Sequence, residues 1–373
     1  MLPLYKHTPQ KPHQAGFSLV EIMVGLVIGL LVSLVIMQVF SVFEGQKRST
    51  TGNADAQTNG NIALYSLQND VQQTGYGLPL MDADNMPLSC LTVSPDIVKA
   101  DGTAGADGVA DVDHDGDAAT PNVNLSPFDI IEGGATGSDQ VIVRYGTSGS
   151  GGTPVQAIDT TTAPKIGVTT NMGCKINDVV FAVKSTDCRA TRVKDLPIAT
   201  QIEVLDATGI TTSTFMSCMG AWNAYLYAVN ANNQLTRNGE VLIDNIVNIQ
   251  AQYGVSASAN NNTITQWVDA SGATWGAAMT TGDRNRIKAL RVAVIARNGL
   301  LEKEVVTSAC SSTTAANPTG LCAWDATSLD SAAVGWEAPT VDLSNLPNWD
   351  HYRYRVYETI IPIRNMVWSS DKL

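Results

Sequence analysis

The feature that most constrains this chain is an uncharged apolar segment near its N-terminus. Residues 22–43 contain no Asp, Glu, Lys or Arg and consist mainly of Val, Ile, Leu, Met and Phe. A helix rises about 1.5 Å per residue, so this segment spans about 33 Å, close to the roughly 30 Å hydrocarbon layer of a bilayer. The segment therefore predicts a membrane-spanning helix.

The residues before the apolar segment indicate its orientation in the membrane and whether it is removed by cleavage. Lys6 and Lys11 lie in residues 1–16, which contain no acid, and this favours a cytoplasmic leader under the positive-inside rule. A secretory signal peptide has its small-residue cleavage site after the apolar core. Here Gly16 precedes the core and residues 41–48 hold no A-x-A pattern, so we expect the apolar segment to remain in the mature protein.

The junction between the leader and the apolar segment resembles the class III signal of type IV prepilins. The residues that carry the resemblance are Gly16-Phe17-Ser18-Leu19-Val20-Glu21, followed by Ile22-Met23-Val24. The resemblance implies that a prepilin peptidase cuts after Gly16 and methylates the new amino terminus at Phe17. It also implies that Glu21 pairs with the terminal amine of a neighbouring subunit during assembly.

Glu21 has a physical reason to seek such a partner. A charged side chain at the centre of a membrane helix costs about 2.5–3.5 kcal/mol on insertion scales, so an acid at the edge of an apolar segment needs a compensating interaction. The amine of a partner subunit supplies one. The alternative is that Glu21 stabilises the first helical turn, where an acid interacts favourably with the helix dipole.

The segment that follows continues the helix and then ends it. Leu64, Leu67 and Val71 recur at the spacing of one helical face, and Gly75 is a typical helix terminator. Internal glycines weaken the helix by about 1 kcal/mol each relative to Ala. We therefore predict one stem helix over residues 17–76, apolar in its first half and amphipathic in its second.

The remainder of the chain changes character twice. Residues 78–137 are rich in Gly, Asp, Pro and Ala and form an acidic insert. Beyond it, segments rich in Val, Ile and Tyr predict strands, and alternation such as Leu290, Val292 and Val294 indicates a buried face. The predicted strands are residues 139–145, 178–184, 225–229, 241–253, 289–297 and 352–361. The predicted organisation is a leader (1–16), a stem helix (17–76, with 22–43 in the membrane), an acidic insert (78–137) and a β-rich head (138–373).

Several blocks along the chain are similar to PilW-type minor pilins. The blocks are residues 64–71, 75–76, 139–145, 246–254, 291–297 and 354–365. The resemblance implies an α+β, type IV pilin-like fold in which a long N-terminal helix packs on an antiparallel β-rich head with inserted loops. It also implies a non-catalytic minor pilin that takes part in type IV pilus assembly or initiation near the pilus tip, and thereby in cell adhesion and twitching motility.

The same resemblance implies a location and partners. The chain is expected to cross the inner membrane once, with a periplasmic head, and then to enter the pilus at the cell surface. Its implied partners are the other minor pilins, the major pilin and the prepilin peptidase. Two alternatives remain: a minor pseudopilin of type II secretion, which the later blocks disfavour, and a membrane-anchored surface adhesin that never enters a filament.

Charge and motifs exclude other functions. The formal net charge is −12, which disfavours nucleic-acid binding, because phosphate contacts need clustered Lys and Arg. The sequence contains no H-E-x-x-H, P-loop or G-x-S-x-G element. We therefore expect no enzymatic activity.

Six cysteines follow the membrane segment, on the side expected to be exported. An even set in an oxidising compartment predicts up to three disulfides, with 15 possible connectivities. Cys310 and Cys322 flank a loop of small and polar residues and are the first predicted pair, and Cys174 with Cys188 is the second. A metal site is the alternative, but no C-x-x-C spacing supports it. The six residues are Cys90, Cys174, Cys188, Cys218, Cys310 and Cys322.

The acidic insert contains a candidate calcium loop. Acids alternate at loop positions one, three and five, and Gly116 stands at position six, as in the loop with which an EF-hand surrounds Ca²⁺. Position twelve is Asn122 in place of the bidentate Glu, so the ligand set is weaker. The alternative is a solvated acidic loop. The candidate ligands are Asp111, Asp113, Asp115, Asp117 (through its carbonyl) and Asn122.

Overall fold

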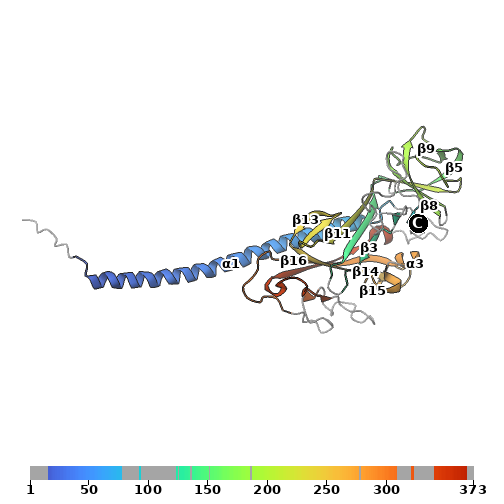
Figure 1. Cartoon of the computed structure of the whole chain (residues 1–373). Helices are drawn as coiled ribbons and strands as arrows, with labels where there is room; N and C mark the ends of the chain where they lie inside the picture. Colours follow the sequence, from blue (N-terminus) through green and yellow to red (C-terminus); the bar gives the residue numbers. More distant parts are fainter. Residues whose placement is uncertain are drawn as a thin grey trace, which may run out of the picture. The chain divides into compact units, whose positions relative to one another are not determined.

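The computed structural model describes residues 16–77, 92–93, 123–124, 126–134, 137–150, 152–184, 187–276, 279–308, 321–322 and 340–367 of the chain. The chain divides into two units, residues 1–52 and residues 53–373, and the β-rich part of the second unit, which follows α1, is called the head below. The predicted α+β class is confirmed: a long N-terminal helix is followed by antiparallel sheets (Figure 1).

Helix α1 (Leu19–Gln73) is continuous through the predicted stem. Its buried apolar side chains in the second unit recur at helical spacing, and they are Ala56, Ala63, Leu67 and Val71. The internal glycines do not interrupt it, because a helix packed on a core does not depend on intrinsic propensity. The predicted terminator is confirmed, since Gly75 has a φ of +76°, the left-handed conformation common after a helix.

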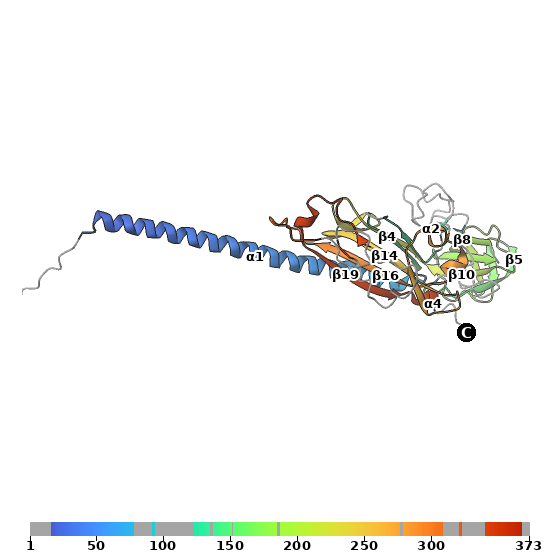
Figure 2. The same ribbon diagram turned by 90° about the horizontal axis from the view of Figure 1, so that it is seen from below.

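Two antiparallel sheets form the body of the head. The five-stranded sheet has the order β13 (Glu240–Asp244), β12 (Gln234–Arg237), β11 (Trp222–Val229), β4 (Gln140–Gly146) and β3 (Phe128–Ile131). The four-stranded sheet has the order β15 (Ile264–Val268), β14 (Ile246–Ser256), β16 (Ile287–Arg297) and β19 (Tyr354–Pro362). Both sheets contribute residues to one apolar core with the second half of α1, and Figure 2 shows the end of α1 beside the strands of the head.

The predicted strands occur as expected with one exception, and the structure adds strands that were not predicted. Residues 241–253 do not form a single strand, because Asn245 has a φ of +61° and separates β13 from β14. A left-handed residue cannot continue a strand, and Asn adopts this conformation more readily than most residues. One added strand is β3, which lies within the segment expected to be an acidic insert and pairs with β4.

Strand β16 is buried on both faces, although alternation predicted at least one. Leu290, Val292 and Val294 lie in the core shared with α1. Ala293 and Ile295 lie in a second cluster on the opposite face, with Val341 and Leu343 among its members. The sequence of β16 is therefore apolar at most positions, which is typical of a strand covered on both sides.

A separate closed barrel is inserted in the chain between β4 and β11. Of its strands, the sequence predicted β7 alone. A core of its own fills the barrel and includes Ile166, Val168, Ile202, Val204 and Met216. The strand order is β10 (Phe215–Gly220), β5 (Val155–Thr162), β6 (Lys165–Val168), β9 (Gln201–Val204), β8 (Asp187–Asp195) and β7 (Val179–Lys184).

A disulfide joins Cys174, which precedes the barrel strand β7, to Cys218 on β10. The predicted pairing of Cys174 with Cys188 is therefore wrong. The reason is the closure of the barrel, in which β10 pairs with β7 and places Cys218 opposite Val180. The side chains of the predicted pair Cys310 and Cys322 lie outside the described residues, as do those of Cys90 and Cys188, so the Cys310–Cys322 disulfide stays a prediction.

The remaining described elements are short. Two two-stranded ladders pair β1 (Thr92–Val93) with β2 (Val123–Asn124) and β17 (Leu321–Cys322) with β18 (Thr340–Val341). The short helices are α2 (Gly272–Trp275), α3 (Thr281–Arg284), the 3₁₀ helix η1 (Trp349–His351) and α4 (Arg364–Val367).

Candidate functional site

The predicted processing residues immediately precede α1. Gly16 and Phe17 are exposed, and the Phe17 side chain is among the most exposed apolar groups, at 81%. The Ser18 N–H donates to Glu21 Oε2 at 3.4 Å, so Glu21 serves the first helical turn, the alternative considered above. The Glu21 side chain is also exposed, and its pairing with a partner's amine stays a prediction.

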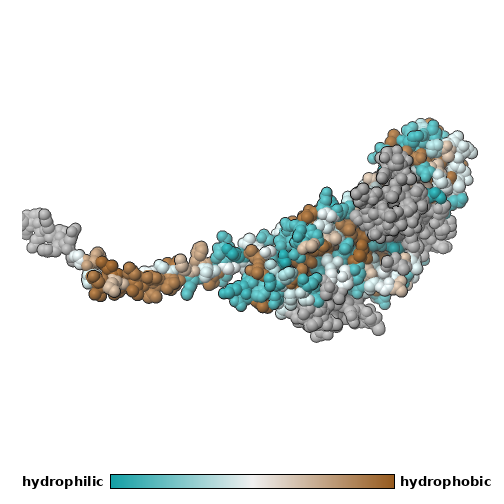
Figure 3. Space-filling view, in the orientation of Figure 1, coloured by the Kyte–Doolittle hydropathy of each residue, from teal (hydrophilic) through white to brown (hydrophobic). Residues whose placement is uncertain are grey.

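The first half of α1 exposes an apolar surface. Among the described residues, α1 is the helix long and apolar enough to cross a membrane, and none of its most apolar stretch is buried. Figure 3 shows this surface as a run of hydrophobic residues along the N-terminal part of α1. Exposing Leu, Ile, Val and Phe side chains to water is unfavourable by about 25 cal/mol per Å², so this half of the helix requires an apolar environment.

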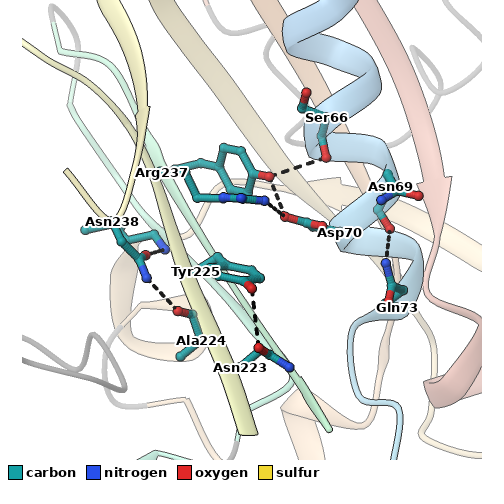
Figure 4. Close-up of polar contacts among 11 residues, drawn as sticks. Ser66, Asn69, Asp70, Gln73, Asn223, Ala224, Tyr225, Arg237 and Asn238 are labelled. Atoms are coloured by element: carbon teal, nitrogen blue, oxygen red, sulfur yellow. Dashed lines mark hydrogen bonds and ion pairs between the residues drawn. The ribbon is translucent and has the colours of Figure 1, made fainter. Parts of the chain in front are cut away.

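A buried carboxylate ties the second half of α1 to the head. Asp70 Oδ2 accepts a 2.5 Å hydrogen bond from the Tyr227 hydroxyl and lies 3.2 Å from Nη1 of Arg237. Figure 4 shows Asp70 on α1 facing Arg237 from β12. The Arg237 guanidinium also lies over the Tyr225 ring, 4.6 Å from its centroid. One carboxylate therefore joins the helix to β11 and β12, and we call this set of contacts the joint.

The environment of the joint keeps its two donor groups protonated. Burial raises the pKa of the Tyr227 hydroxyl, and its hydrogen bond to Asp70 raises it further. Desolvation opposes the charge of Arg237, but its interactions with Tyr227 and Asp70 outweigh that effect and raise its pKa. The donors of the joint thus stay in place across the pH range in which proteins are folded.

Residues from distant parts of the chain cap the C-terminus of α1. Asn365 Nδ2 donates to the carbonyl oxygens of Thr74 and Gln73, at 2.8 and 3.3 Å. The Gly75 N–H donates to the Arg144 carbonyl at 2.9 Å. The Asn365 amide thus supplies a donor to carbonyls at the end of the helix, and the Gly75 bond joins that end to β4, so the helix ends against β4 and the segment after β19.

A second buried ionic cluster connects β3 and β4 to helix α3. The Asp129 carboxylate binds two guanidinium groups. Its Oδ2 lies 2.7 Å from Nη1 of Arg144, and its Oδ1 lies 2.6 Å from Nη1 of Arg284. The Arg144 side chain is fully buried. Burial opposes ionisation of Asp129, but the two guanidinium groups outweigh it and hold its pKa below the ordinary value. The cluster supports the position of the β3–β4 hairpin.

The candidate calcium ligands lie outside the described residues, so calcium binding stays a prediction. These residues are Asp111, Asp113, Asp115, Asp117 and Asn122. Within the part of the chain that the structure describes, no group of three or more His, Cys, Asp or Glu side chains is arranged to hold a metal ion.

The sequence did not identify the joint. Asp70 and Asn365 both lie in blocks singled out by resemblance, but no role could be given to either. An available signal was an acid beside the apolar face formed by Leu67 and Val71, because a buried acid requires a partner. The identity of that partner, 167 residues away at Arg237, had no sequence signal.

Comparison with known families matches two parts of the chain. Residues 217–365 match the type IV pilus-assembly protein W (PilW) family, and residues 11–37 match the prokaryotic N-terminal methylation motif. The first range begins within β10 and extends past β19, so β5 to β9 of the barrel lie outside it. Comparison with curated proteins and with solved structures gave no match.

Proposed function

We propose that this chain, a prepilin-like protein of the PilW type, is a minor pilin that takes part in type IV pilus assembly near the pilus tip. The observation that carries the proposal is the exposed apolar half of α1, of whose most apolar stretch nothing is buried. In the membrane these side chains face lipid, and in a pilus they face the stems of other subunits. Burial of apolar surface is maintained in both settings.

Two properties of the head support this position: its large size and its fixed attachment to the stem helix α1. The joint and the cap at Asn365 hold the second half of α1 against two sheets, so a force applied to the stem is passed to the head through buried contacts. A head of this size fits poorly in a repeating shaft. This favours a position at the tip or in an initiation complex, with other minor pilins and the major pilin as partners.

The alternatives are less well supported. A minor pseudopilin of type II secretion would carry the same N-terminal motif, and the match of residues 217–365 to the PilW family favours the pilus. A surface adhesin would keep its leader, and the methylation motif favours cleavage after Gly16 by a prepilin peptidase. We place the anchored chain in the inner membrane with a periplasmic head before assembly.

Replacing Glu21 with Ala is expected to leave membrane insertion intact and to reduce the number of pili several-fold. The apolar surface that drives insertion is unchanged, whereas the carboxylate that pairs with a partner's amine is lost. The measurement combines immunoblots of membrane fractions with pilus counts by electron microscopy, in cells whose own copy carries the variant.

The matched control is Glu44→Ala, on the same helix. Glu44 forms an exposed ion pair with Arg48 at 3.2 Å, and such pairs contribute little, so piliation should match the wild type. Normal piliation in Glu21→Ala would contradict the assembly role of Glu21, and loss of the protein from the membrane would show that the residue acts in insertion.

A further inference from the structure

The loop between β3 and β4 connects the two sheets of the head. The Asp139 N–H donates to the Ile249 carbonyl at 2.8 Å, and the Ile249 N–H donates to Ser138 Oγ at 2.9 Å. Asn248 Nδ2 donates to the Gly137 carbonyl at 3.2 Å. Because β3 and β4 belong to the five-stranded sheet and β14 to the four-stranded sheet, these bonds hold one sheet to the other.

The carboxylate of Asp139 is the centre of this connection. Its Oδ1 accepts the Gly133 N–H at 2.9 Å, which closes the loop on itself. Its Oδ2 accepts the Ala251 N–H of β14 at 2.8 Å. Asp139 is 1% exposed, so both of its oxygens depend on these donors rather than on water.

A second carboxyl group lies against the first. Glu132 immediately precedes Gly133, whose N–H binds Asp139, and two ionised carboxylates close together repel each other and cannot hydrogen-bond to each other. Glu132 Oε2 is buried and accepts no hydrogen bond from the described residues. A proton on Glu132 reconciles these observations, because the protonated carboxyl can donate to Asp139.

The charged surroundings favour retention of that proton. Asp269, which follows β15, adds a third acid and accepts a 2.8 Å hydrogen bond from Gln252 Nε2. Arg291 lies opposite Gln252 in the register of β14 and β16 and supplies a cation on the neighbouring strand. Burial, followed by the charges of Asp139 and Asp269, raises the pKa of Glu132 to about 7. Burial and the charge of Asp269 raise the pKa of Asp139 to about 6, although its two backbone donors oppose the shift.

We propose that Glu132 and Asp139 form a proton-dependent latch between the two sheets of the head. With at least one proton on the pair, the loop stays bonded to β14. Without a proton, two negative charges at this partly buried site repel each other, and the bonds at Ile249 and Ala251 open more often. The proposal concerns the head alone and does not depend on entry into a pilus.

The direction of the pH effect follows from proton linkage. A pKa raised in the folded state means that the folded head binds more protons than the unfolded chain between the ordinary and the shifted values. The stabilising contribution of the pair is therefore complete below about pH 4 and is lost as the pH rises through about 7. An exported head would experience this change directly, because it lies outside the buffered cytoplasm.

Hydrogen exchange of the full-length chain in detergent micelles tests the latch. Exchange at the Ile249 and Ala251 amides is compared at about pH 5.5 and about pH 8.5, after correction for intrinsic rates. We expect their protection to fall about tenfold or more in the wild type. In Glu132→Gln, which removes the titrating group, protection should change by less than about twofold. Glu240→Gln, at an exposed position on β13, should behave as the wild type.

Two outcomes would overturn the latch. One is equal protection of the Ile249 and Ala251 amides at both pH values in the wild type. The other is a loss of protection in Glu132→Gln, between the two pH values, as large as that in the wild type. Asp139→Asn gives a second test, because an amide presents a donor where Asp139 has an acceptor. The amide keeps a single acceptor oxygen, so at least one of the two backbone N–H groups that bind Asp139, Gly133 or Ala251, should exchange rapidly at both pH values. Wild-type protection in Asp139→Asn would show that the carboxylate does not hold the loop.

Discussion

Asp129→Ala is expected to lower the free energy of unfolding of the head by about 3–5 kcal/mol. The substitution leaves the guanidinium groups of Arg144 and Arg284 without the carboxylate that they share, at side-chain exposures of 0% and 9%. Removing one partner from a buried ionic cluster is costly because the remaining charges cannot be solvated. Denaturant unfolding of the purified chain in detergent, followed by tryptophan fluorescence, measures the loss.

The matched control for this variant is Asp55→Ala, an exposed position on α1, which should change stability by less than about 0.5 kcal/mol. The contribution of Asp129 should also depend on pH. Because its pKa is held below the ordinary value of 3.8, its stabilisation is present above that value and is lost as the pH falls through the lower, folded-state pKa. A loss of less than about 1 kcal/mol near neutral pH would show that the cluster is not needed to hold the β3–β4 hairpin.

Asp70→Ala is expected to lower the free energy of unfolding by about 2–4 kcal/mol and to loosen α1 from the head. The Tyr227 hydroxyl is buried and loses its 2.5 Å acceptor. Arg237 loses its carboxylate but remains partly exposed, at 38%, so water compensates for part of its loss. Hydrogen exchange of α1 amides near residues 63–71, together with denaturant unfolding, measures both effects.

A graded series separates the two contributions of Asp70. Asp70→Asn keeps an acceptor for Tyr227 but removes the charge that faces Arg237, so its loss should be about half that of Asp70→Ala. Equal losses in both variants would assign the effect to the ion pair, and wild-type stability in Asp70→Ala would show that apolar packing alone holds the joint.

The sequence predicted those helices and strands whose residue pattern lies within one short stretch of the chain. The apolar residues before Glu44 predicted the first half of α1, and Gly75 marked its end because a left-handed residue stops a helix. Strand β16 was evident from a run of β-branched and apolar residues between Ile287 and Arg297. In each case the residues that determine the element lie within it.

The barrel was not predicted because several of its strands are too short to show a period. Strands β6 and β9 have four residues each, and each contributes two buried apolar residues at alternate positions, such as Ile166 and Val168. Two apolar residues separated by one polar residue also occur in many loops. What makes them strands is closure around a shared core, which depends on segments far apart in the chain.

The partners in the buried ionic contacts had no local signal. Asp129 and Arg284 are 155 residues apart, and each resembles a surface charge when considered alone. The same limit explains the incorrect cysteine pairing, because proximity in sequence favoured Cys188 and barrel closure brought Cys218 to Cys174. Pairing of charges and of thiols is a property of the folded topology, and single residues do not encode it.

The central claim is that the apolar half of α1 stays in the mature protein after removal of the leader. Intact-mass and N-terminal peptide mass spectrometry of the protein purified from its own membranes tests this directly. We predict a polypeptide that begins with N-methylated Phe17 and retains residues 17–43. A mature chain that begins at Met1, or one that lacks residues 17–43, would contradict the assignment.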